Sequence, residues 1–358
     1  MDAMDGYQAL SPTVLPLVEW YRSGHRDLPW RRDPTPYHVW ISEIMLQQTR
    51  VQAAIPYYER FLSLFPDAAA LARAPQEKLL KAWEGLGYYS RARNLQKAAR
   101  MICERFDGRF PTSYDEWLSL PGVGPYTAGA VCSIAFGLPV PAVDGNVLRV
   151  FSRLLALEED VTAPTVKKEL NELASSLVPP DAPGEYNQAL MELGATVCLP
   201  NGAPLCGSCP VAGHCRAFQD GNQASFPLKS PKKPRKILPV TVFLIEYQGR
   251  WALMKRPDKG LLASLWEFPQ KEGHLDSRQA ASCFDGWLRL SGEPRPLLPA
   301  VHVFTHLEWR MSGWKIHVKE VLPGCPFTWA KPEELQHTYA IPSAFSSFLP
   351  ACFVQNDL

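Results

Sequence analysis

The sequence predicts an α+β multidomain chain, in which an all-helical domain precedes a smaller α+β domain. Three observations lead to this prediction. The 358 residues, 46% of them hydrophobic, are sufficient for two cores. Up to about residue 218, apolar side chains recur at helical spacing between prolines. Beyond a basic, proline-rich stretch, the pattern changes to short β-type runs. We therefore expect domains at residues 1–218 and 237–358, joined by a linker at 219–236.

Charge and cysteine content narrow the class of protein. The net charge is +1, so a nucleic-acid site would have to come from local clusters of basic residues. Residues 1–6 hold two aspartates and no basic residue, unlike a signal peptide. The uncharged run at 126–143 contains glycines and prolines, which favours a buried helix and a connector over a membrane span. With nine cysteines, an odd number, these features predict a cytoplasmic protein, in bacterial terms a nucleoid-associated one.

The chain begins with helices. The apolar spacing of residues 8–23 predicts one amphipathic helix that ends at Gly24. Thr35 and Pro36 have the residue types of an N-cap and a first turn, so a second helix begins there.

Glu43 lies among the apolar residues of that second helix. Burial disfavours the charged form of a carboxyl group, so Glu43 can stay protonated near neutral pH and act as a general acid. The alternative is a solvated helix face, or an ion pair with Arg31 or Arg50.

The stretch Leu118–Arg153 reads as a helix, a glycine-rich hairpin, a second helix, a proline-broken connector and a further helix. Ser113 and Glu116 have capping-box spacing for the helix before it. Pro121–Gly124 must turn, because its glycines allow positive φ and leave backbone amides unshielded. Pro125 suits the first position of the next helix, whose N-terminus carries a partial positive charge. Such a hairpin can hold one DNA phosphate.

Asp144 stands before a further helix. Its simplest role is to cap that helix, which is a common use of aspartate. A catalytic carboxylate is the alternative, and one residue can do both.

A loop and a basic helix follow one another at 85–103. This stretch has four basic residues and no acidic one, after a glycine-flanked loop that carries Leu86 and Tyr88. The arrangement predicts a wedge that enters the base stack beside a helix that meets phosphates. A solvated basic face with tyrosines in the core is the alternative.

Four cysteines lie close together, as Cys198-x7-Cys206-x2-Cys209-x5-Cys215. This grouping argues for a metal site rather than for disulfides. The site is either an iron–sulfur cluster or a structural zinc with four cysteine ligands. A zinc site would be indicated more strongly by two CxxC pairs, and this chain has one.

The last part of the chain changes character twice. Residues 219–236 hold five basic residues among prolines, with no acid after Asp220. This segment is either a plain linker or an extended contact to DNA or an acidic partner. Beyond it the β-type runs begin, and Gln248–Gly249 and Ser312–Gly313 predict hairpin turns.

Five separated motifs together resemble the adenine DNA glycosylases, the MutY family of the endonuclease III or helix-hairpin-helix superfamily. They are SEIMLQQTRV at 42–51, WEGLGYYSRARNL at 83–95, PGVGPYTAGA at 121–130, VDGN at 143–146 and the cysteine cluster. The resemblance covers most of residues 8–218.

A sixth stretch extends the resemblance. LLASLWEFP at 261–269 is similar to the matching stretch of the family's C-terminal domain, which has a Nudix-like α+β fold. The glutamate-rich REUxEExG helix of a working Nudix hydrolase does not follow it, so this domain should recognise rather than hydrolyse.

The resemblance implies a role for each matching residue. The implied catalytic residues are Glu43, Asp144, Asn146 and Tyr126. The implied DNA contacts are Gln48, Leu86, Tyr88, Arg91, Gly122, Val123 and Gly124, and the implied adenine pocket is Trp30, Arg31, Leu46, Val51 and Gln188. Phe304, Thr305 and His306 fall where the family inspects 8-oxoguanine, with threonine in place of serine. Cys198, Cys206, Cys209 and Cys215 would bind a 4Fe-4S cluster, although the first gap is one residue longer than the family's six.

The resemblance implies an enzyme that removes adenine mispaired with 8-oxoguanine or guanine from double-stranded DNA. Superfamily members that also cut the strand have a lysine where Tyr126 stands, and a phenol cannot form a Schiff base. We therefore expect hydrolysis without an efficient lyase step, by a monomer that needs no membrane. Two other classes remain open: an endonuclease III-like glycosylase and lyase, and a non-enzymatic module that binds damaged DNA.

Overall fold

The structure is a computed structural model that describes residues 3–231 and 234–353. Contacts divide these residues into two units, the first holding residues 3–73 and 94–231 and the second holding residues 74–93 and 234–353. Lys232 and Lys233 of the predicted basic linker lie outside the described residues. Within the described part, none of the helices has the length and apolar character needed to cross a membrane.

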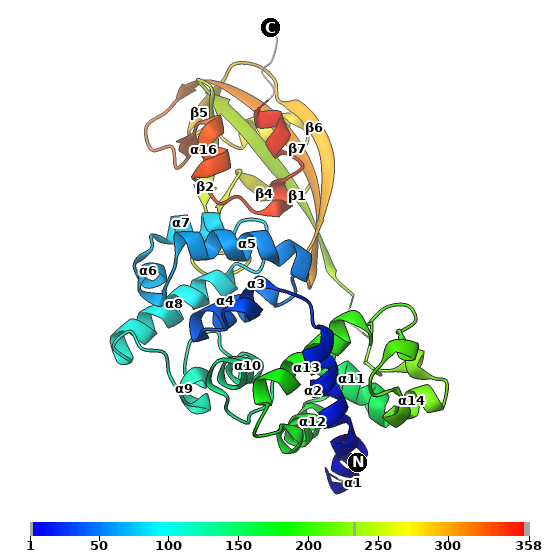
Figure 1. Cartoon of the computed structure of the whole chain (residues 1–358). Helices are drawn as coiled ribbons and strands as arrows, with labels where there is room; N and C mark the ends of the chain where they lie inside the picture. Colours follow the sequence, from blue (N-terminus) through cyan, green and yellow to red (C-terminus); the bar gives the residue numbers. More distant parts are fainter. Residues whose placement is uncertain (1–2, 232–233, 354–358) are drawn as a thin grey trace. The chain divides into compact units, whose positions relative to one another are not determined.

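The first unit is helical (Figure 1). One of its cores gathers residues from the N-terminal helices, from α11 to α13 and from the cysteine region. The helices are α1 (Ala3–Leu10), α2 (Val14–Gly24), α3 (Pro29–Arg32), α4 (Pro36–Leu46), α5 (Val51–Leu64), α6 (Ala68–Arg73), α9 (Tyr114–Leu118), α10 (Pro125–Phe136), α11 (Gly145–Leu155), α12 (Pro164–Leu177), α13 (Pro183–Thr196) and α14 (Arg216–Gln219). Helix α7 (Gln76–Ala82) belongs to the second unit, and α8 (Ser90–Arg105) begins there and continues in the first.

Local signals set several helix ends as predicted. The Thr35 side chain accepts a hydrogen bond from the His38 amide at the start of α4. Ser113 and Glu116 form the complete capping box of α9. Pro125 occupies the first turn of α10. Thr35 and Ser113 accept hydrogen bonds from amides that the helix leaves unpaired, and Pro125 has no amide N–H that would need a partner.

The prediction of one helix over residues 8–23 is wrong. The chain forms α1 and α2 with a short 3-10 turn at Ser11–Thr13 between them. Pro12 has no N–H group to continue the α-helical pattern. The buried Thr13 hydroxyl donates to the Leu10 carbonyl and closes the break.

Two glycines allow backbone segments of the first unit to approach closely. A Cβ atom at Gly129 of α10 would lie 1.9 Å from the carbonyl oxygen of Pro141. In the hairpin, Gly122 has a φ of +78°, and a Cβ there would lie 2.6 Å from that of Asn94 on α8. A side chain at Gly129 would push α10 away from the connector that contains Pro141, and one at Gly122 would push the hairpin away from α8.

The second unit contains an eight-stranded mixed sheet with the order β3-β2-β1-β7-β5, in which β4 pairs with β1, β6 with β7 and β8 with β2. Strands β1 and β7 are parallel, from Lys236 opposite Leu307 to Glu246 opposite His317. The other pairs are antiparallel. The strands are β1 (Lys236–Tyr247), β2 (Arg250–Lys255), β3 (Trp266–Glu267), β4 (Gln270–Glu272), β5 (Leu288–Leu290), β6 (Arg295–Val303), β7 (Leu307–Val321) and β8 (Thr328–Ala330).

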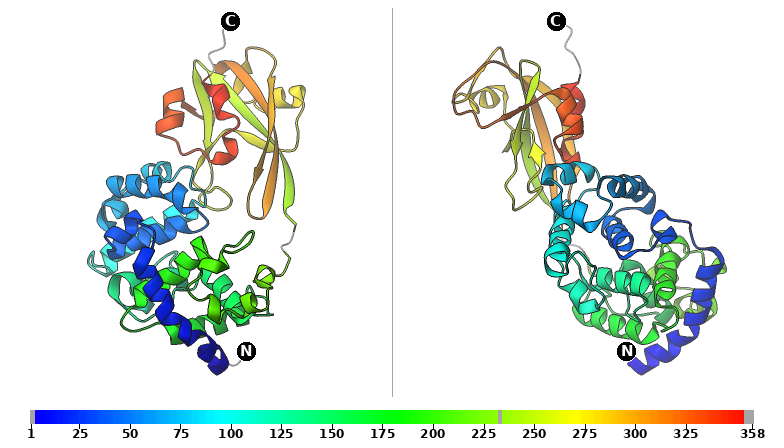
Figure 2. Two further views of the ribbon diagram at one scale, coloured as in Figure 1. Left: turned by 45° about the vertical axis from the view of Figure 1, so that its right-hand side comes forward. Right: turned by 60° about the vertical axis from the view of Figure 1, so that its left-hand side comes forward.

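Helices cover both faces of this sheet. Along β1, Val242 and Leu244 enter one core while Phe243 and Ile245 enter the other, as the alternation of a strand requires. Helix α16 (Pro332–His337) packs on the first core and α15 (Ser277–Ser282) on the second, and Figure 2 shows them on opposite faces.

Of the two predicted hairpin turns, one is present. Gln248 and Gly249 both have positive φ and connect β1 to β2. The prediction at Ser312–Gly313 is wrong, because β7 runs through it without a break. Gly313 serves packing there, since a Cβ atom would lie 2.6 Å from the ring of Phe348.

Candidate active site

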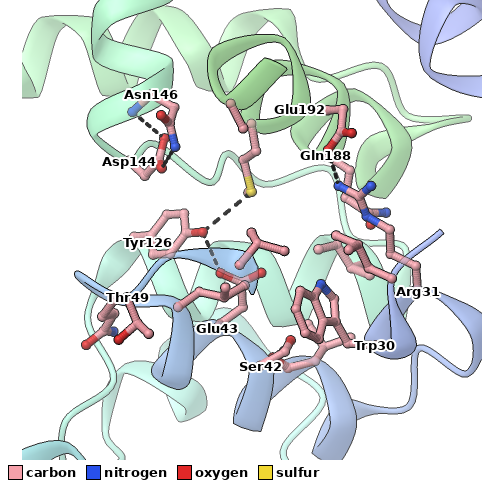
Figure 3. A pocket seen from close by; sticks show the side chains of 18 of the residues that line it. Trp30, Arg31, Ser42, Glu43, Thr49, Tyr126, Asp144, Asn146, Gln188 and Glu192 are labelled. Atoms are coloured by element: carbon pink, nitrogen blue, oxygen red, sulfur yellow. Dashed lines mark hydrogen bonds and ion pairs between the residues drawn. The ribbon is translucent and has the colours of Figure 1, made fainter. Parts of the chain in front are cut away.

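A cavity of about 600 Å³ opens among the helices of the first unit. The four predicted catalytic residues, Glu43, Tyr126, Asp144 and Asn146, all line it (Figure 3). They come from three separate motifs, on α4, on α10 and at the start of α11. Tyr126 lies between Glu43 and Asp144 in this view. Tertiary packing thus brings the separated motifs to one place.

Glu43 is buried on α4, with only 6% of the residue exposed. The alternative of a solvated helix face is therefore wrong. The Tyr126 hydroxyl donates a hydrogen bond to Glu43 Oε2. Burial raises the pKa of Glu43 from 4.5 to about 7, while the Tyr126 hydrogen bond opposes the rise and the Asp144 charge adds to it. Near neutral pH the side chain can therefore hold a proton and release it.

Asp144 caps α11, as its position predicts. Its Oδ1 accepts hydrogen bonds from the backbone amides of Asn146, at 2.8 Å, and Val147, at 2.9 Å. Its Oδ2 accepts from the Asn146 side chain at 2.6 Å. Burial raises the pKa of Asp144, and these three donors act against that rise. The helix N-terminus and Asn146 thus support a carboxylate facing the cavity.

The residues of the implied adenine pocket also line the same cavity. Trp30 supplies an aromatic face and Arg31 a cation. Leu46 and Val51 supply aliphatic side chains, and Gln188 supplies an amide. The amide of Gln188 donates to the Gly184 carbonyl within α13 at 3.3 Å. An apolar wall with a few polar groups is the usual composition of a pocket for a small planar ligand.

Glu192 was not identified from the sequence, although it fixes part of this wall. It is 2% exposed and accepts hydrogen bonds from the guanidinium groups of Arg26 and Arg31. Burial tends to raise the pKa of Glu192, but the hydrogen bonds and charges of both arginines outweigh burial and lower it to about 2. Arg31 therefore pairs with Glu192 rather than with Glu43. Glu192 lies four residues after Gln188 on the same helix, so both side chains share one helix face. That spacing could have indicated Glu192 from the sequence.

The four clustered cysteines line one small cavity together with Arg153 and apolar residues. Arg153 donates to Cys198 Sγ at 3.2 Å, which suits a negatively charged thiolate. None of the nine cysteines forms a disulfide. Among the described residues, no three His, Cys, Asp or Glu side chains form a ready single-ion site. The four cysteines are thus gathered in one place, with no disulfide between them.

The hairpin has the form expected of a phosphate site. Gly122 is exposed, and Gly124 is the N-cap of α10 with Pro125 behind it. Val123 differs in that it is buried, with 8% of the residue exposed. Gln48 is exposed with a φ of +59°, lies two residues after the end of α4 and lines the active-site cavity.

The glycine-flanked loop before α8 lies in the second unit. Tyr88 is 46% exposed with a φ of +47°, whereas Leu86 is buried. Arg91 requires a correction. The residue is 8% exposed, and its guanidinium donates to the carbonyls of Leu86 and Gly87, at 3.0 and 3.1 Å. It holds the loop from inside rather than offering its charge to a phosphate.

Phe304, Thr305 and His306 form the turn between β6 and β7. Phe304 packs edge-to-face on Trp309, with the ring centroids 5.0 Å apart. Thr305 and His306 are exposed. The turn is therefore anchored by the packed ring of Phe304, and it exposes the polar side chains of Thr305 and His306.

Family models match both parts of the chain. The model of the HhH-GPD superfamily base excision DNA repair proteins matches residues 41–176, and that of the NUDIX domain matches residues 241–351. The helical match includes Glu43, Tyr126 and Asp144. The second match includes the turn at 304–306.

Curated relatives extend over most of the chain. An adenine DNA glycosylase of Rattus norvegicus is 37% identical over 365 residues, which cover 86% of this chain and 70% of the relative. One of Schizosaccharomyces pombe is 30% identical over 90% of this chain and 85% of its own length. Among solved structures, a thermostable thymine-DNA glycosylase has a TM-score of 0.55 and 29% identity, over 61% of this chain and all of its own.

Proposed function

The chain belongs to the adenine DNA glycosylases, which hydrolyse N-glycosidic bonds in base excision repair, and on that basis we propose that it removes adenine opposite 8-oxoguanine or guanine. The observation that carries the proposal is the pair of carboxyl groups in one cavity, of which Glu43 is buried and Asp144 is partly buried. Glu43 has its pKa raised to about 7, and Asp144 is held by three N–H donors. Two carboxyl groups in different surroundings can divide the roles of acid and anion.

In the proposed reaction, the duplex releases the adenine into the cavity of Figure 3. Extrusion of a base costs a few kcal/mol and costs least at a mispair. Glu43 donates its proton to N7 of the adenine, and the C1′–N9 bond breaks with its electron pair leaving on the base. The Asp144 carboxylate stabilises the positive charge that develops on the sugar. Water adds to C1′ and loses a proton, so the products are free adenine and an abasic sugar.

Tyr126 supports a monofunctional enzyme. Strand cleavage by this superfamily's route needs an amine that attacks C1′, and position 126 has a phenol whose hydroxyl is bonded to Glu43. Its pKa is raised far above the ordinary value, chiefly by burial, so it stays neutral and can orient Glu43. Asn146 can orient Asp144 in the same way, through the hydrogen bond from its side chain to Asp144 Oδ2.

For the opposite strand, we propose that Gln48 and Tyr88 enter the duplex and that Thr305 and His306 inspect the base opposite the adenine. The exposure of all four side chains supports this assignment. The amides of Gly122, Val123 and Gly124 would hold one phosphate. The domain division that goes with this proposal is 1–218 for catalysis and 237–358 for recognition.

The four cysteines fit a 4Fe-4S cluster, because they line one cavity and an arginine contacts one of the sulfurs. Cys198, Cys206, Cys209 and Cys215 would each hold one iron. When bound, the cluster would serve structure by closing the loop at 198–215.

A duplex with one labelled adenine opposite 8-oxoguanine tests the proposal. After incubation with the protein, denaturing gels are run with and without hot alkali. Strand cleavage only after alkali is expected from a monofunctional glycosylase. Cleavage without alkali would favour the glycosylase and lyase, and binding without any product would favour the non-enzymatic module.

A further inference from the structure

Residues 74–93, named the wedge segment here, belong by their contacts to the unit that contains the sheet. The segment consists of α7, a turn and the first residues of α8. It carries Tyr88, the side chain that we propose enters the DNA duplex. The segment is far in sequence from the rest of its unit, which begins at residue 234, so side-chain contacts within this unit must hold it.

Lys81 makes the first of these contacts. Its ammonium group donates to the carbonyl oxygens of Leu335, at 3.1 Å, and Tyr339, at 3.0 Å, at the end of α16. The Lys81 side chain is only 15% exposed. Hydrogen bonds from a charged donor in a sheltered place are stronger than neutral ones, and two of them fix the ammonium in position.

Glu84 makes the second contact, three residues further on. Its Oε1 accepts a hydrogen bond from the backbone amide of Ile341 at 2.8 Å. Its Oε2 lies 2.6 Å from Lys81 Nζ, so the two side chains also pair with each other. Together they bind three backbone groups of residues 335–341 and satisfy polar groups that would otherwise be desolvated without partners.

The other end of the wedge segment is attached as well. Arg93 donates to the Ala263 carbonyl at 2.7 Å. Near the tip, the Tyr88 and Thr305 hydroxyls lie 3.0 Å apart, at hydrogen-bond distance. Residues 87–90, 260–263 and 302–307 line one cavity of about 420 Å³ in this unit. The loop with Tyr88 and the turn with Thr305 therefore lie next to each other within the second unit.

From these contacts we infer that Lys81 and Glu84 are positioning residues. They fasten the wedge segment to residues 335–341, so that the loop that enters the duplex and the turn that inspects the opposite base are held as one piece. The part of this inference that concerns base inspection rests on the proposed function. The part that concerns fastening rests on the contacts alone.

The test uses the full-length protein and the variants Lys81→Met, Glu84→Gln and the double variant. Lys168→Met is the control, because Lys168 pairs with Glu172 on an exposed face of α12. Hydrogen exchange is measured on the free protein. We expect amides of residues 84–91 and 335–341 to exchange about tenfold faster in Lys81→Met, since local opening becomes easier. The control should exchange like the wild type.

The same variants are then assayed for adenine removal opposite 8-oxoguanine and opposite guanine under single-turnover conditions. We expect the preference for 8-oxoguanine to fall about fivefold in Lys81→Met, with removal opposite guanine within about twofold of wild type. Glu84→Gln keeps an acceptor for the Ile341 amide and should show a smaller effect.

Unchanged exchange in the double variant would overturn the inference. Faster exchange with an unchanged preference would overturn the link to base inspection. A wild type without any preference for 8-oxoguanine would instead contradict the proposed function, while the exchange data would still decide whether Lys81 and Glu84 fasten the segment.

Discussion

At the scale of single residues, the two carboxyl groups of the cavity differ in the donors that reach them. Glu43 receives one hydroxyl hydrogen bond, whereas Asp144 receives two backbone amides and one side-chain amide. Burial raises the pKa of Glu43 most, and the negative charge of Asp144 raises it further. The cavity therefore holds one carboxyl group with a strongly raised pKa and one that three N–H donors support, and changes at Glu43 should separate proton donation from binding.

Glu43→Gln should abolish adenine removal while DNA binding persists. Glutamine has nearly the same shape but no proton to donate, and general acid catalysis contributes about 10²–10⁴ in rate. Single-turnover kinetics and binding to the same duplex check this. A variant that cleaves at the wild-type rate would contradict the role of Glu43 as the acid.

The same substitution should stabilise the protein at alkaline pH. The native state keeps the proton of Glu43 up to about pH 7, whereas the unfolded chain releases it near 4.5. Wild-type stability therefore declines as pH rises through this range, and Glu43→Gln escapes a loss of about 3 kcal/mol at pH 8. Denaturant unfolding at pH 5 and pH 8 measures it. An advantage of the same size at both pH values would contradict the assigned pKa.

Tyr126→Phe should move the pH dependence of adenine removal upward. The Tyr126 hydroxyl lowers the pKa of Glu43, so its loss lets the acid stay protonated to higher pH. The alkaline limb of the pH–rate profile should shift to higher pH even if the maximal rate falls. A profile that keeps its position would mean that the hydrogen bond does not tune the acid.

At the scale of elements, helix ends and loops hold the functional groups. The N-terminus of α11 serves Asp144, and the loop after α13 carries the cysteines. Arg153 of α11 links the two by contacting Cys198 Sγ and the Leu199 carbonyl. The cysteine loop therefore supports the helix whose N-terminus holds Asp144, the proposed catalytic carboxylate.

Cys206→Ser should remove the visible absorbance of the purified protein and lower its thermal midpoint. A cluster closes the loop by binding four thiolates, and serine replaces one of them poorly. Cys103→Ser is the matched control, because Cys103 lies on α8 outside the cysteine cavity. A colourless wild-type protein that contains zinc, prepared without oxygen, would refute the cluster.

At the scale of the whole molecule, the predicted linker is partly folded. Arg153 donates to the carbonyls of Gln223 and Phe226, which attaches this stretch to the first unit. Asp160 accepts from the Ser230 amide at 3.0 Å. In the second unit, Arg235 donates to the Phe304 carbonyl at 3.1 Å. The described residues on both sides of 232–233 are therefore anchored within their own units.

Asp160→Ala should expose the end of the first unit to protease. Hydrogen bonds from Ser230 and Thr162 hold the pKa of Asp160 well below its usual range, so the anchor is intact at neutral pH. Trypsin should cut after Lys229 faster in this variant than in the wild type, and Glu158→Ala in the same loop is the control. Equal rates in all three proteins would show that Asp160 does not anchor Ser230.

The sequence by itself determined the features that depend on near neighbours and on motifs. Capping at Thr35, Ser113 and Asp144 was predictable because one side chain serves backbone groups two or three residues away. The family followed from spaced motifs, and its members are similar over most of the chain. The two carboxyl groups of the proposed active site were also singled out in this way, although not their surroundings.

Only the tertiary structure decided what depends on distant partners. Glu192 fixes Arg31 from 161 residues away, and Lys81 binds carbonyls more than 250 residues away. Arg91 is of a residue type that contacts DNA, but its side chain bonds to carbonyls of its own loop. Gly313 is of a residue type that forms turns, but it lies in a strand next to Phe348. Short sequence signals report the needs of the local backbone. Which charge is buried, and which glycine meets a ring, is set by the packing of segments that the local sequence does not specify.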